Sequence, residues 1–80
     1  MVETPFWQKV LVKVTVGDLR GSIKNPMLAD FYEMHINPGF VVALEPISES
    51  ITLVEVGNRF VYVNMPIDEV GKLLFPDYGL

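Results

Sequence analysis

The chain has 80 residues, of which half are apolar and one fifth are charged, and its formal net charge is −4. A chain of this length is too short for two independent cores and too apolar for a disordered segment, so we expect one domain over residues 1–80. It contains no cysteine, which excludes disulfides, thiolate metal ligands and a thiol nucleophile. One small monomeric core has difficulty burying so much apolar surface, which favours a homo-oligomer or an obligate partner.

The charge pattern and the start of the chain limit the partners that we consider. The six basic residues stand singly along the chain, whereas nucleic acids and anionic membranes require clustered positive charge. Residues 1–5 lack the pattern of a signal peptide, and no apolar run approaches the roughly 20 residues that a membrane-spanning helix needs. We therefore expect a cytoplasmic protein that binds protein rather than membrane or nucleic acid.

The first predicted element is a strand over Trp7–Val16, in which valines alternate with Lys9, Lys13 and Thr15. The alternation then ends, and glycine, asparagine and proline recur over Gly17–Ala29. We predict a long connection there, functional or a plain hairpin tip. Its Gly-Asp-Leu-Arg-Gly run lacks the Gly-Lys-Ser/Thr ending of a phosphate-binding loop, so we interpret it as a turn.

Four further strands are predicted. Phe31–Ile36 and Phe40–Leu44 flank an Asn-Pro-Gly turn, and a polar connection over Glu45–Ser50 follows. Ile51–Val56 and Arg59–Val63 flank Gly-Asn, a two-residue loop typical of tight hairpins.

That loop fixes the register of the last hairpin, with Val54 opposite Val61 and Leu53 opposite Tyr62. Both faces of the hairpin are then apolar: one carries Val54, Val56, Val61 and Val63, and the other carries Ile51, Leu53, Phe60 and Tyr62. Since an antiparallel sheet with one solvated face needs only one apolar side, the second face must be covered by the remaining chain or by another molecule.

One helix is predicted over Pro66–Phe75, with proline in its first turn, acidic residues near its start and an apolar stripe at three- and four-residue spacing. An apolar, aromatic tail follows it. The order of elements indicates a mainly β domain with five strands and one C-terminal helix, arranged as a small bent antiparallel sheet or an SH3-like barrel.

From Ile36 to Leu74 the chain reads Ile-Asn-Pro-Gly-Phe, Leu-Glu-Pro, Ile-Thr-Leu, Val-Gly-Asn-Arg-Phe-Val-Tyr-Val and Asp-Glu-Val-Gly-Lys-Leu-Leu. In its order and spacing this half of the chain resembles the small flagellar FlbD (SwrD) family. The resemblance implies the same succession of turn, strands and short helix. A phage or mobile-element protein is an alternative origin.

No catalytic or metal-binding constellation is evident. His35 is the only histidine, and we interpret it as a surface or packed residue rather than a catalytic base. The carboxylates Glu45, Glu49, Glu55, Asp68 and Glu69 lack the spacing of a calcium loop and are interpreted as a solvated rim. We therefore expect neither a cofactor nor an enzymatic activity.

Aromatic residues are the more informative group, because tryptophan, tyrosine and phenylalanine are enriched at the centres of protein interfaces. We select Trp7, Tyr62, Phe75 and Tyr78 as interface residues. The leading hypothesis is a protein-interaction module that forms a homo-oligomer or serves as a small accessory or regulatory subunit. The alternative is a small barrel that binds a ligand or nucleic acid through Lys9, Lys13 and Arg59.

Overall fold

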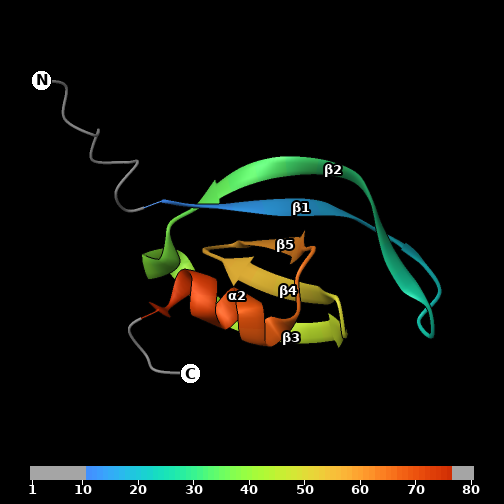
Figure 1. Ribbon diagram of the computed structural model, residues 1–80. Helices are drawn as coiled ribbons and strands as arrows, with labels where there is room; N and C mark the ends of the chain where they lie inside the picture. The colour runs from blue at the N-terminus through green and yellow to red at the C-terminus, as the bar shows by residue number, and fades with distance from the viewer. Residues whose placement is uncertain (1–10, 77–80) are drawn as a thin grey trace, which may run out of the picture.

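The computed structural model describes residues 11–76. They form five strands, one short 3-10 helix and one α-helix (Figure 1). In chain order the elements are β1 (Val12–Gly21), β2 (Pro26–Ile36), η1 (Pro38–Phe40), β3 (Val41–Ser48), β4 (Ile51–Val56), β5 (Arg59–Val63) and α2 (Ile67–Leu74).

All five strands belong to one antiparallel sheet in the order β2-β1-β5-β4-β3. The pairs β1–β2, β3–β4 and β4–β5 are hairpins of consecutive strands, and the first strand also pairs with the last. Strands β2 and β3 form the two edges, so the sheet is bent but remains open rather than closing into a barrel (Figure 1). This architecture confirms the predicted mainly β fold with one C-terminal helix.

The hairpin of β4 and β5 has the register that its Gly57-Asn58 loop predicts. Val54 lies opposite Val61, Leu53 opposite Tyr62, and Glu55 opposite Phe60. Gly57 has a φ of 60°, a left-handed conformation that glycine adopts without steric cost.

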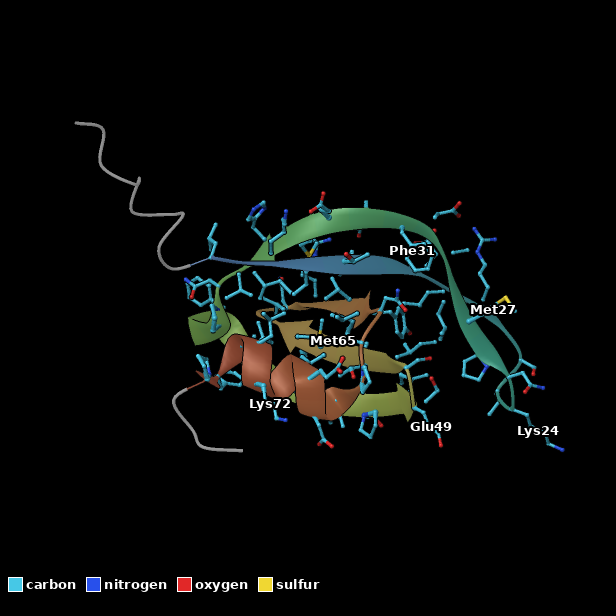
Figure 2. The ribbon with its side chains drawn as sticks, viewed as in Figure 1. Lys24, Met27, Phe31, Glu49, Met65 and Lys72 are labelled. Atoms are coloured by element: carbon cyan, nitrogen blue, oxygen red, sulfur yellow. The ribbon has the colours of Figure 1, made fainter. Side chains whose placement is uncertain are left out.

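The core lies between the sheet and helix α2, which runs across one face of the sheet beside β3 and β4 (Figure 1). Buried side chains from β1, β2, β4, β5 and the helix form one cluster, and it comprises Val14, Val16, Ile36, Val54, Val61, Val63, Val70 and Leu74. Met65 packs against this cluster just before the helix (Figure 2). Thr52, the one fully buried polar residue in the described range, donates a hydrogen bond from Oγ1 to the Met65 carbonyl oxygen over 2.8 Å.

The long connection predicted over Gly17–Ala29 is wrong. Strand β1 continues to Gly21 and β2 begins at Pro26, so that only four residues form the turn. The Gly-Asp-Leu-Arg-Gly run predicted as a turn is the end of β1. The alternating pattern fails here because this part of the hairpin projects beyond the rest of the sheet, where neither face needs to be apolar throughout (Figure 1).

A β-bulge separates this projecting part from the sheet. Val16 pairs with Tyr32 and Asp18 pairs with Ala29, so that two residues of β2, Asp30 and Phe31, stand opposite the single residue Gly17. Asp30 has a φ of 54°. Because bulges bend a strand and increase its twist, the hairpin turns away from β5 beyond Gly17 (Figure 1).

The polar connection predicted over Glu45–Ser50 is also shorter than expected, because β3 extends to Ser48. Pro46 lies within this strand, opposite Thr52. Proline is tolerated here because β3 is an edge strand, and the missing N–H can face away from the sheet. The predicted turn at Asn37 is confirmed as the start of η1, where its side chain accepts a hydrogen bond from the Gly39 N–H over 2.8 Å.

Candidate functional site: an acidic and aromatic sheet face beside a projecting arm

The sheet face opposite helix α2, which we call the outer face, carries two rows of side chains across neighbouring strands. The first row follows the paired residues Ala43, Glu55 and Phe60. The second row runs through Glu45, Leu53, Tyr62 and Gly17. Directly paired residues in a sheet have Cβ atoms about 5 Å apart, so the Phe60 ring has the Glu55 carboxylate close to it, whereas the direct neighbours of Tyr62 are Leu53 and Gly17.

The aromatic residues of the outer face are only partly covered. Phe60 is 60% exposed and Tyr62 is half-buried. Helix α2 lies on the other side of the sheet, so it cannot cover them (Figure 1). The second apolar face of the β4–β5 hairpin, which the sequence predicts, is therefore partly open.

Glu45 and Glu55, the outer-face carboxylates on β3 and β4, form no ion pair within residues 11–76. Within residues 11–76 the ion pairs join Lys13 to Glu33 and Arg20 to Asp30 and Asp18, and none of them includes Glu45 or Glu55. The outer face near Phe60 therefore combines uncompensated negative charge with exposed aromatic surface.

Unlike Glu45 and Glu55, Glu33 has a basic partner, Lys13. Lys13 Nζ lies 2.9 Å from Glu33 Oε2, and both side chains are well exposed. The hydrogen bond from Lys13, followed by its positive charge, holds the pKa of the Glu33 carboxyl below its usual range. His35 adds a smaller effect in the same direction.

A pocket opens at the border between the outer face and the projecting hairpin. Strands β1 and β5 pair only through Val16 with Val63 and Gly17 with Tyr62, and beyond Gly17 they separate. The space between them, about 390 Å³, is lined by Asp18 and Tyr32 on one side and by Phe60 and Tyr62 on the other. A pocket of this size fits one or two side chains of a ligand.

The projecting part of the β1–β2 hairpin, residues 18–29, is called the arm below. Its tip carries Ile23, which is fully exposed, and Met27, which is 58% exposed. Phe31, at the base of the arm, is 54% exposed. Figure 2 shows Met27 and Phe31 on this hairpin, with Lys24 at its tip, away from the helix and its core. The arm therefore presents large apolar side chains that no other described part of the chain covers.

Of the four residues selected from the sequence as interface residues, the structure describes Tyr62 and Phe75, and these two lie on opposite sides of the sheet. Tyr62 lies on the outer face and lines the pocket. Phe75 ends helix α2 and packs, half-buried, against the core cluster. Trp7 and Tyr78 lie outside the described residues.

Of the three basic residues considered for nucleic-acid binding, the structure describes Lys13 and Arg59, and Lys9 lies outside the described residues. Lys13 pairs with His35 on the side of β1 away from the buried valines. Arg59, at the start of β5, lines a hollow that His35 also lines.

A search of residues 11–76 for clusters of three or more histidine, aspartate or glutamate side chains that could hold a metal ion finds none. The same residues contain no helix of the length and apolar character needed to cross a membrane.

Sequence reasoning misses Phe31, Tyr32 and the arm, because the bulge at Asp30 leaves no pattern in the sequence. The one available signal is Gly17, which interrupts an otherwise regular strand. A Cβ atom there would lie 2.8 Å from the Ala29 carbonyl oxygen and 3.2 Å from Phe31 Cδ1. Such a close approach is a typical reason for glycine within a strand.

No protein-family model matches the chain, and no curated protein or solved structure matches it.

Proposed function

We propose that this chain is a non-enzymatic protein-interaction module, a homo-oligomer or a small accessory subunit, and that it uses the arm as its contact surface. The observation that carries this proposal is the exposure of large apolar side chains on the arm, with Ile23 fully exposed at its tip and Met27 exposed on β2. Burying such side chains gains about 25 cal/mol per Å² of apolar surface removed from water.

The edge strand β2 supports the same proposal. Its outer edge runs over Pro26–Ile36 and is not paired with another described strand. Lysine and proline, which commonly protect an edge, are absent from the middle of this strand. Its acidic residues Asp30 and Glu33 are neutralised by Arg20 and Lys13, so they repel an approaching strand only weakly.

Membership of the FlbD family, which the sequence resembles, is compatible with a small non-catalytic protein. It remains a prediction. The alternative of a small barrel that binds nucleic acid receives no support from the charge of the chain, which is −4 with six basic residues.

The test is the solution mass at several protein concentrations, measured by light scattering after size exclusion. We expect a multiple of the 9.0 kDa chain mass for the wild type. The double substitution Ile23→Ser with Met27→Ser removes apolar surface from the arm, and it is expected to reduce the mass to that of one chain. The control is Val42→Ser, because the 66% exposure of Val42 lies between those of Met27 and Ile23 but the residue is on β3.

A solution mass of one chain for the wild type at every concentration would overturn self-association. The chain would then be proposed only as an accessory subunit of another protein. That role requires the wild type to retain a defined protein from its native host that the double variant does not retain. Equal retention by both would overturn the arm as the contact surface.

A further inference from the structure

We propose that the outer face binds a basic, extended peptide segment of another protein, with lysine or arginine side chains placed over Phe60 and Tyr62. This inference rests on the proposed function, since it names the chemistry of a partner, but it uses a surface other than the tip of the arm.

The first argument is charge. Phe60 lies between two groups of acidic residues, with Glu45 and Glu55 on one side and Asp18 across the pocket on the other. No lysine or arginine lines this pocket or the smaller hollow on the other side of Phe60, which is lined by Ala43, Glu45, Leu53, Glu55 and Phe60. Arg20 Nη2 lies 2.7 Å from Asp30 but 3.8 Å from Asp18, so its closer contact is with Asp30. The surface around Phe60 is therefore complementary to positive charge.

The second argument is the aromatic surface. An ammonium or guanidinium group is attracted to the face of an aromatic ring, and nearby carboxylates strengthen the attraction. Phe60 and Tyr62 are two residues apart on β5, which places them on the same face about 7 Å from each other. Basic side chains at positions i and i+2 of an extended peptide have the same spacing, so each ring can receive one of them.

The third argument is the seam between β1 and β5. The bulge turns the arm away after Gly17, so that the edges of Asp18–Arg20 and Arg59–Val61 face each other without pairing. Backbone N–H and C=O groups along an unpaired edge can bond to an added strand. This feature favours an extended peptide over a free small cation, because a peptide can use these groups while its side chains occupy the pocket.

The probe is the pentapeptide acetyl-Thr-Lys-Val-Lys-Thr-amide, titrated into the full chain and followed through backbone amide chemical shifts. A second peptide with norleucine in place of both lysines has similar length and apolar surface but no charge. We expect saturable shifts on β4 and β5 around Phe60 and Tyr62, and about fivefold or greater weakening with the norleucine peptide. Added salt is expected to weaken binding of the lysine peptide only.

Two sets of variants locate the site. Phe60→Thr retains a good strand residue and removes the ring, and we expect about fivefold weaker binding of the lysine peptide. Glu45→Gln with Glu55→Gln removes the local charge and is expected to weaken binding at least as much. The matched control is Glu49→Gln with Glu69→Gln, which changes the net charge equally but lies in the β3–β4 turn and on helix α2. An unchanged spectrum elsewhere confirms that each variant is folded.

Equal binding of the two peptides would overturn the inference, as would equal weakening by the two pairs of glutamine substitutions. The double variant Ile23→Ser with Met27→Ser is expected to bind the lysine peptide normally. If the arm variant has a smaller solution mass but still binds the peptide, the result concerns the arm alone. If an outer-face variant loses peptide binding but keeps the wild-type solution mass, the result concerns the outer face alone.

Discussion

The acidic residues of this protein differ in whether the fold gives them a basic neighbour. Asp18, Asp30 and Glu33 on the β1–β2 hairpin each lie within 4 Å of Lys13 or Arg20, whereas Glu45 and Glu55 on the outer face have no such neighbour in the described range. Pairs on an exposed surface contribute little to stability. Their effect is to neutralise the carboxylates of this hairpin, whereas Glu45 and Glu55 beside Phe60 keep their charge.

At the residue scale, Glu33 should show this pairing in its titration. Its pKa is held below the usual range by Lys13, so the ion pair favours the folded state above the pKa of the unfolded chain and is lost as the pH falls through the folded-state pKa. Replacing Lys13 with glutamine should raise the pKa of Glu33 toward that of an exposed glutamate, as measured by side-chain carboxyl shifts in an NMR titration.

The control for that titration is Lys72→Gln, which removes the same charge from helix α2. If Lys72→Gln moves the pKa of Glu33 as far as Lys13→Gln does, the shift reflects net charge rather than the 2.9 Å contact.

Single residues were predictable from the sequence where a local rule applied to them. The Gly57-Asn58 loop fixes the pairing of Val54 with Val61, and the structure confirms that pairing. The burial of Phe75 against the core was not predictable in the same way, because it depends on where the helix docks.

At the element scale, helix α2 is short and contains Gly71, so its stability comes from docking rather than from intrinsic propensity. Val70 and Leu74 face the core cluster and are buried, while Leu73 lies on the exposed side. The apolar stripe in the sequence predicts the helix, but tertiary packing decides which leucine is buried.

These two adjacent leucines provide a matched test. Leu74→Ala should lower the free energy of unfolding by about 2–5 kcal/mol, because it removes a buried side chain and leaves a cavity. Leu73→Ala should change it by less than about 1 kcal/mol. Urea unfolding followed by circular dichroism measures both, and equal losses would contradict the docking of the helix through Leu74.

Strands with one buried face were predictable as elements, whereas the arm was not. The alternation over Val12–Val16 follows from burial of Val14 and Val16, but beyond Gly17 both faces of the hairpin are largely exposed, so the pattern is lost although the strand continues. The candidate site was predictable in part: the apolar second face of the last hairpin and the position of Glu55 opposite Phe60 follow from its loop, whereas Glu45 becomes adjacent only through the register of β3.

At the scale of the whole molecule, the direction of the arm depends on Gly17. A Cβ atom at this position would lie 2.8 Å from the backbone oxygen of Ala29, so the two strands would have to move apart at the bulge. We expect Gly17→Ala to lower the free energy of unfolding by about 1–3 kcal/mol in urea unfolding and to shift amide resonances along the arm.

The comparison variant is Gly39→Ala, where the nearest atom to the added Cβ is the Asn37 side-chain oxygen at 3.2 Å rather than backbone. Its loss of stability should be smaller. A larger loss for Gly39→Ala than for Gly17→Ala would show that the bulge tolerates a side chain.

The pairing of β1 with β5 also bears on how the chain folds. The hairpins β1–β2, β3–β4 and β4–β5 join neighbouring segments, but the contact of Gly17 with Tyr62 closes a loop that contains most of the chain. Closing so long a loop has a large entropic cost, so the local hairpins form first and the β1–β5 seam forms late. During synthesis β1 emerges well before its partner β5, and until the seam closes its unpaired edge can pair with another nascent chain.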